Sequence, residues 1–164
     1  MRGLPARPPV AAVLGPMVLG CLGATDAGAK PPGRRPPDQH AHQPARTMKI
    51  RINIEGRSVA ATLNGSEAAR DFAALLPLTL TLEDYASTEK VADLPRKLST
   101  RGAPPGSDPE VGDLAYYAPW GNLAVYYRDF GYSAGLVKLG RIDASLEALE
   151  RPGPVRVTIA RVGP

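Results

Sequence analysis

The chain has 164 residues, enough for one domain with additional segments, and its formal net charge of +4 is unevenly distributed. Residues 1–47 carry six basic and two acidic side chains, whereas residues 48–164 carry fourteen of each. The expected domain is therefore formally neutral, so nucleic-acid binding, which needs a basic patch, loses its main support from composition and is not expected. Cys21, His40 and His42 are the only cysteine and histidines, which excludes thiol, Ser/His/Asp and His- or Cys-ligated zinc sites from residues 48–164. No metal and no cofactor are predicted.

The first 29 residues have the layout of an export signal, with a positively charged start and an uncharged apolar run over residues 10–24. Residues 18–21 resemble a bacterial lipobox, in which Cys21 would be lipidated, and residues 27–29 fit ordinary signal cleavage. The chain is therefore expected to be exported: periplasmic, secreted or lipid-anchored. We expect membrane contact only through a lipidated Cys21.

Residues 30–47 contain five prolines and almost no large apolar side chain, so a disordered linker is expected there. Within it, His40 and His42 are interpreted as solvated residues rather than metal ligands. An alternative is that translation starts at Met48, where the first convincing strand begins, and that the protein is cytoplasmic.

The expected domain, residues 48–164, opens with a hairpin and a helix. Apolar residues alternate over 48–54 and again over 57–63, and Glu55-Gly56 between them is a turn. Residues 67–76 show helical spacing of apolar side chains behind Asn and Ser caps.

The middle of the domain is expected to be less regular. Leucines at alternate positions predict a strand over residues 78–82, after which prolines and glycines over 83–111 predict a long surface excursion.

Seven of the nine aromatic residues lie in the next stretch, residues 112–143, where alternation predicts strands over 114–117 and 123–127. Aromatic side chains with polar tips suit a half-buried wall that receives a ligand. Five of them are predicted to bind ligand: Tyr116, Trp120, Tyr126, Phe130 and Tyr132. Ordinary packing in a sheet core is the alternative.

A strand over 136–142, a short helix from Asp143 through Glu150 and a last strand over 155–162 complete the series. Seven or eight short strands with two short helices and no βαβ rhythm predict a mainly β protein, a small closed antiparallel barrel.

Several segments in order resemble the small bacterial and archaeal cyclophilin-like proteins, reduced relatives of cyclophilin. The segments are MKIRINI (48–54), LPLTLTLEDY (76–85), GDLAYYAPWGNLAVYY (112–127) and LVKLGRID (136–143). The resemblance covers the whole domain and implies the cyclophilin barrel.

The resemblance implies much less about activity. Cyclophilins isomerise prolyl bonds with an Arg guanidinium and an apolar pocket, but their Phe-His-Arg motif is absent, and Leu123-Ala124-Val125 stands where they have Ser-Gln-Phe. The first hypothesis is thus a module that binds a peptide or a small apolar ligand. The alternatives are a weak peptidyl-prolyl cis-trans isomerase, with Arg141 or Arg128 as its guanidinium, and a purely structural or protein-contact domain.

Carboxylate chemistry at Glu83, Asp84 or Glu89 is a further candidate. Neighbouring strand residues point to opposite faces, so Glu83 and Asp84 should not share a site. Glu89 and Lys90 are interpreted as a surface ion pair of small energetic value.

Overall fold

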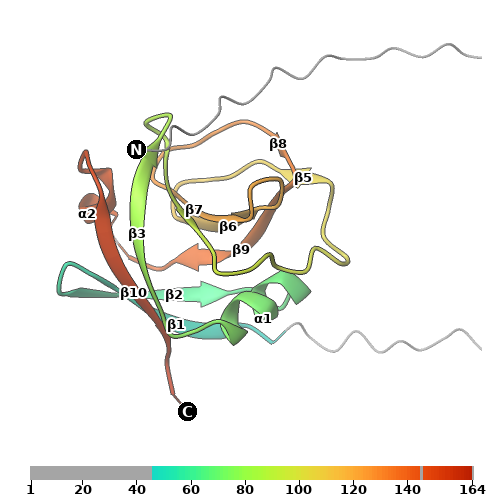
Figure 1. Cartoon of the computed structure of the whole chain (residues 1–164), viewed down its shortest axis with the longest axis horizontal. Coiled ribbons are helices and arrows are strands. Elements are labelled where there is room, and N and C mark those ends of the chain that lie inside the picture. The colour runs from blue at the N-terminus through green and yellow to red at the C-terminus, as the bar shows by residue number, and fades with distance from the viewer. Residues whose placement is uncertain (1–45, 145, 164) are drawn as a thin grey trace, which may run out of the picture. The chain divides into compact units, whose positions relative to one another are not determined.

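The computed structural model describes residues 46–144 and 146–163 (Figure 1). The predicted signal over 1–29, its Cys21, and the linker up to residue 45 with His40 and His42 lie outside these residues. The strands are β1 (Met48–Ile54), β2 (Arg57–Leu63), β3 (Leu78–Tyr85), β4 (Glu89–Asp93), β5 (Gly106–Ser107), β6 (Asp113–Tyr117), β7 (Asn122–Tyr126), β8 (Ser133–Ala134), β9 (Leu136–Ile142) and β10 (Val155–Arg161). The helices are α1 (Glu67–Ala74) and α2 (Glu147–Glu150).

Eight strands form a closed antiparallel barrel in the order β1-β10-β3-β4-β7-β6-β9-β2, and β5 pairs with β8 in a separate two-stranded sheet. The barrel predicted from the sequence is confirmed. Closure leaves none of these eight strands with an unpaired edge.

The hairpin β1–β2 forms part of the barrel wall, and its alternating side chains point in turn to the core and to solvent. Ile50, Ile52 and Ile54 are buried, whereas the residues between them are exposed. The turn uses positive φ at Glu55 and Gly56, which suits the right-handed twist of the two strands.

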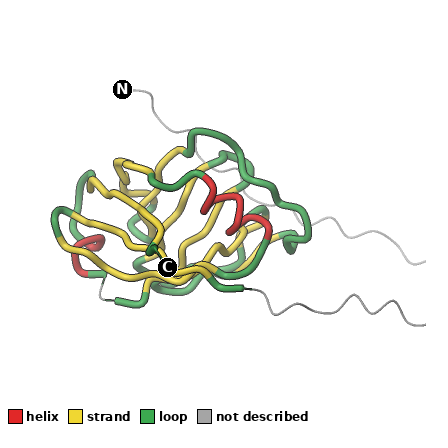
Figure 2. Tube along the Cα trace, turned by 90° about the horizontal axis from the view of Figure 1, so that it is seen from below, coloured by secondary structure: helices red, strands yellow, loops and turns green. Residues whose placement is uncertain are grey.

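The two helices lie at opposite sides of the barrel (Figures 1 and 2). Ser66 caps the N-terminus of helix α1, because its side chain accepts a hydrogen bond from the Ala69 amide. Phe72 of this helix is completely buried in the barrel core. Helix α2 contributes Leu149 to the same core. No helix among the described residues is both long enough and apolar enough to span a membrane.

The expectation of an irregular segment over 83–111 is wrong at its start. Strand β3 continues to Tyr85, and β4 follows after a tight turn in which Ala86 and Ser87 have positive φ. Neither residue is of the Gly, Asn or Asp type that normally signals such a turn, so the pattern did not reveal it.

The second helix is shorter than predicted. It begins at Glu147 rather than after Asp143, and no side chain caps it. Instead, the Asp143 carboxylate accepts hydrogen bonds from Thr62 and Lys49, and so ties the end of β9 to β1 and β2. The Thr62 hydroxyl, followed by the Lys49 ammonium, lowers the pKa of Asp143.

Candidate functional site

Apolar side chains cover both faces of the barrel wall on β4, β6, β7 and β9. The inner core faces the barrel interior and includes Leu114, Tyr116, Leu123 and Val125. A second cluster occupies the opposite face of the same strands and consists of Val91, Ala115, Ala124, Tyr126 and Leu136, with Tyr85 and Tyr117 packed against it. The wall therefore has a second apolar layer outside the barrel.

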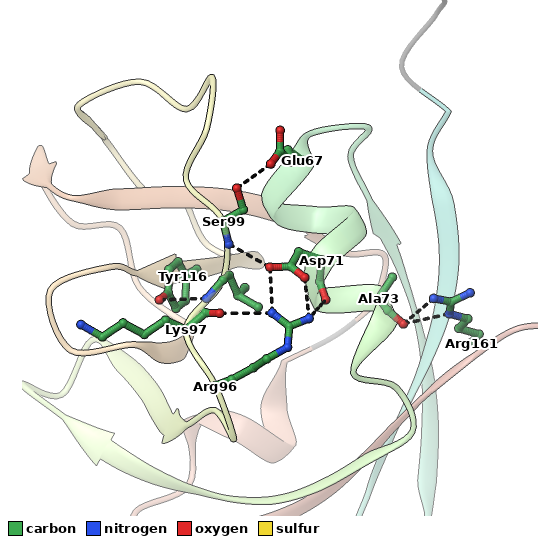
Figure 3. Close-up of polar contacts among 9 residues, drawn as sticks. Glu67, Asp71, Ala73, Arg96, Lys97, Ser99, Tyr116 and Arg161 are labelled. Carbon is green, nitrogen blue, oxygen red and sulfur yellow. Dashed lines mark hydrogen bonds and ion pairs between the residues drawn. The ribbon is translucent and has the colours of Figure 1, made fainter.

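Tyr116, one of the predicted ligand-binding residues, belongs to the inner core. It is 1% exposed, and its hydroxyl accepts a hydrogen bond from the Leu98 amide at 3.1 Å (Figure 3). The hydroxyl thus satisfies a buried donor of the segment that follows β4.

Tyr126 and Trp120 lie with the outer cluster. Tyr126 is 1% exposed and pairs in register with Glu89 on β4. Trp120, in the β6–β7 turn, is half-buried and makes edge-to-face contacts with Tyr85 and Tyr117, both with ring centroids 5.4 Å away.

Phe130 and Tyr132 are exposed on the segment that precedes β8. The Tyr132 ring lies against Gly106, where an added Cβ atom would come within 2.7 Å of the Tyr132 hydroxyl. The five predicted residues are therefore distributed over three places: the barrel interior, the outer layer and an exposed loop.

The two arginines predicted as catalytic candidates are both exposed. Arg141 on β9 pairs with Glu110 at 2.9 Å and is 3.7 Å from Asp113, whereas Arg128 follows β7.

The interpretation of Glu89 and Lys90 as a surface ion pair is wrong, because both are buried and alternation places them on opposite faces of β4. The Lys90 ammonium is 2.8 Å from Asp84 and donates to the carbonyls of Arg151 and Gly153, both at 2.7 Å. Its burial is therefore compensated by three oxygen acceptors.

Asp84 serves as the centre of this network. It also accepts hydrogen bonds from the Gly153 amide and the Tyr127 hydroxyl. The hydrogen bond from Lys90 lowers the pKa of Asp84. Burial, together with the Asp84 charge, raises the pKa of Tyr127. These interactions hold the loop before β10 against the barrel. We therefore assign Asp84, Lys90 and Tyr127 a structural role.

We define the outer aromatic layer as Tyr85, Tyr117, Trp120 and Tyr126 together with the buried polar residues Glu89 and Asn122. Strand register explains how it forms: Tyr85 is opposite Glu89, Glu89 is opposite Tyr126, and Asn122 is opposite Tyr117. The sequence analysis named Trp120, Tyr126 and Glu89, but it did not bring them together.

Small residues form the floor of the outer aromatic layer. Glu89 and Tyr126 form one row across the strands, and Asn122 and Tyr117 form another. Between these two rows, Val91 pairs with Ala124, and Ala124 pairs with Ala115. Tyr85 and Tyr117, the two rings that hold Trp120, both pack against this cluster. Aromatic side chains thus pack over an apolar row of Val and Ala side chains.

Asn122 is the polar residue that sequence reasoning missed. It is 2% exposed, and its Oδ1 atom is buried without a hydrogen-bond partner among the described residues. Asn122 follows Gly121 between two predicted strands, where Asn is a common turn residue. The sequence therefore gave no reason to consider it for binding.

In the described part of the chain, His, Cys, Asp and Glu side chains do not gather in groups of three or more that could hold a metal ion. What the outer aromatic layer can do is stack rings and make a few buried hydrogen bonds.

Comparisons with known proteins support the family and the fold. A family model described as the cyclophilin-like family matches residues 52–160. The solution structure of a hypothetical protein from Archaeoglobus fulgidus is similar, with a TM-score of 0.52 and 21% sequence identity over 74% of this chain and 99% of that one. No curated protein matches the chain.

Proposed function

The chain belongs to the cyclophilin-like family, and from that premise we propose that it is a binding module that holds a short peptide segment or a small apolar ligand against the outer aromatic layer. The observation that carries this proposal is the position of Trp120. Its ring is held edge-on by Tyr85 and Tyr117, and both of these pack on the small-residue floor. Ligand sites typically combine such apolar surface with a few placed polar groups.

Asn122 and Glu89 are the polar groups that would orient the ligand. A buried oxygen that lacks a donor costs roughly 1–3 kcal/mol, and a ligand N–H that reaches Asn122 Oδ1 would recover this cost. Because that oxygen is covered, the ligand must first displace a side chain. Trp120 lies in a turn, so it can move without disturbing a strand.

Trp120 is the only tryptophan, so its fluorescence reports directly on this layer. We would titrate the full chain with tetrapeptides that contain a central Ala-Pro bond or, as a matched probe, a central Ala-Ala bond. A saturable change in Trp120 emission that Tyr85→Ala weakens, and that Arg156→Ala on the exposed face of β10 leaves unchanged, supports the proposal. No saturable change with either peptide counts against it.

Tyr132→Ala tests the wider set of residues predicted from the sequence. If the site extends to the exposed loop, this substitution weakens binding as well. If the outer aromatic layer acts alone, affinity stays at the level of the unmodified chain.

Isomerase activity is expected to remain near the uncatalysed rate, because the Phe-His-Arg and Ser-Gln-Phe stretches of cyclophilins are missing and Arg141 is already paired with Glu110. Losing one positioned electrostatic group typically costs about 10²–10³-fold in rate. A prolyl isomerisation assay on the full chain, with Arg141→Ala and Arg128→Ala beside it, tests this. Rapid turnover that either substitution abolishes would favour an isomerase.

We also propose that the domain works outside the cytoplasm, on the basis of the signal-like residues 1–29. N-terminal sequencing of the native protein tests this. A mature chain that starts at Met48 in the cytoplasm would overturn it, and a lipid on Cys21 would select the lipobox.

A further inference from the structure

A second, separate pocket lies between α1, the segment 101–104 and β9, and it has a volume of about 470 Å³. This volume is in the range of small-molecule sites, roughly 300–1,000 Å³. None of its lining residues belongs to the outer aromatic layer. We propose that this pocket, called the α1 pocket below, binds a small organic anion: an acidic head group on an apolar body.

The apolar body would contact side chains that already line the pocket. Ala103, which is half-buried, and Pro104, which is exposed, offer apolar surface from the loop, and Ala68 and Val137 contribute to the lining from the inner core. A ligand that is only an inorganic anion would leave this surface without a partner, so we infer an apolar part.

The acidic head group follows from the charges around the pocket. Arg70, Arg101 and Lys138 line it, whereas Glu67 is the only acidic residue of the lining. No carboxylate of the described residues lies within 4 Å of Arg70, which donates to the Gly65 carbonyl.

The other two cations have acidic neighbours, and the contact of Arg101 is the weaker of the two. Arg101 is 84% exposed and 3.8 Å from Glu67, whereas Lys138 pairs with Asp113 at 2.8 Å. Arginine forms bidentate hydrogen bonds with carboxylate and phosphate groups, so Arg70 and Arg101 are the residues we expect to hold the head group.

The loop wall of the pocket is fixed before any ligand arrives (Figure 3). The Ser99 hydroxyl donates to Glu67 at 2.6 Å, and the Ser99 amide donates to Asp71 at 2.8 Å. Arg96 donates to both carboxylate oxygens of Asp71, which anchors the loop to α1 a second time.

The opposite wall is fixed as well, because the Asn64 side chain donates to the Lys138 carbonyl at 2.8 Å and accepts from the Ser66 amide. Walls that are already in place spare the ligand the entropy of ordering them. The α1 pocket is thus preformed.

The test uses amide chemical-shift titrations of the full chain with four probes: phenylacetate, phenyl phosphate, benzyl alcohol and inorganic phosphate. We expect the two aromatic anions to shift amides at 66–70, 101–104 and 137–138. We expect benzyl alcohol, which lacks the charge, and inorganic phosphate, which lacks the apolar body, to bind about tenfold more weakly or worse. A preference between the first two probes distinguishes a carboxylate ligand from a phosphorylated one.

The matched variants are Arg70→Gln with Arg101→Gln, and Arg156→Gln on the exposed face of β10. The double substitution should weaken binding of the aromatic anions by at least about tenfold, whereas Arg156→Gln should leave it unchanged. Both Arg70 and Arg101 are exposed, so the fold should survive, and urea unfolding checks this.

Equal binding of benzyl alcohol and phenylacetate would overturn the proposal, as would full affinity in the double variant. Shifts confined to the residues around Trp120 would assign the anion to the outer aromatic layer instead and would also overturn it. The proposal does not rest on the function proposed above, because the two sites share no residue. Trp120 fluorescence reports on the outer aromatic layer, whereas amide chemical shifts report on the α1 pocket.

Discussion

The inner core and the outer aromatic layer lie on opposite faces of the same strands, and they differ in how they treat polar groups. In the inner core, the Tyr116 hydroxyl has a hydrogen-bond donor, and the ammonium of Lys90 has three oxygen acceptors. In the outer aromatic layer, Asn122 Oδ1 is buried without a donor. The inner face thus gives these buried polar groups partners, whereas the outer face leaves one buried oxygen without a donor among the described residues.

The largest effect is expected at Phe72, which is completely buried and joins α1 to the inner core. Phe72→Ala should destabilise the protein by about 3–5 kcal/mol, since it removes a large buried ring and leaves a cavity. Urea unfolding followed by circular dichroism measures this. Tyr85→Ala, at a half-buried side chain of the outer aromatic layer, should cost less, and an equal cost would break the comparison between the layers.

Lys90→Met should cost about 3 kcal/mol, because the carbonyls of Arg151 and Gly153 and the Asp84 carboxylate lose their shared donor. The matched control is Lys49→Met, which breaks the exposed Lys49–Asp143 pair and should change the free energy of unfolding by less than about 1 kcal/mol. Equal effects of the two substitutions would show that the Lys90 network is not structurally important.

Tyr116→Phe should cost about 1–2 kcal/mol, because the Leu98 amide is left without an acceptor inside the inner core. Tyr132→Phe, at a side chain that is 58% exposed, should have no measurable effect on urea unfolding. If Tyr116→Phe leaves the free energy of unfolding unchanged, the inner core also tolerates an unsatisfied polar group, and the two faces do not differ in this respect.

The contact between Asp71 and Arg96 lies outside both layers, and the stability that it contributes at neutral pH should be lost in acid. The hydrogen bond from Arg96, followed by that from the Ser99 amide, lowers the pKa of Asp71 below its ordinary value of 3.8. The stability it contributes is therefore complete above pH 3.8 and is lost as the pH falls through the lowered folded-state value. Asp71→Asn should reduce this acid-induced fall in melting temperature, whereas Asp93→Asn on β4 should leave it unchanged.

The smallest change, with the opposite sign, is expected at Asn122. Asn122→Leu should leave the free energy of unfolding unchanged or raise it by up to about 1 kcal/mol, because it removes an unsatisfied buried oxygen. Asn64→Leu should instead destabilise the protein, since the Asn64 amide makes two hydrogen bonds. A marked loss of stability in Asn122→Leu would show that the outer aromatic layer is structural.

The sequence was sufficient to predict the barrel because alternation is local. Ile50, Ile52 and Ile54 identify one inner face without reference to any other strand. The β3–β4 hairpin escaped prediction because its turn residues, Ala86 and Ser87, adopt positive φ without the usual residue types.

The site was harder to predict for a different reason. Tyr116 and Tyr117 are neighbours, as are Tyr126 and Tyr127, and each pair contributes one ring to each face of the wall. Alternation shows that the rings separate, but which ring points outward depends on pairing with distant strands. The face that Glu89 occupies likewise depends on the position of β4 between β3 and β7, which alternation alone does not predict.

The closed ring also determines how the domain is presented to its surroundings. Strand β7 is four strands away from β1 in either direction around the barrel, and the Val162 amide at the C-terminal end bonds to Lys49 on β1. Both ends of the described chain therefore lie at β1, across the barrel from Tyr126 on β7. A partner that reaches the outer aromatic layer would approach the part of the wall that is farthest from both ends.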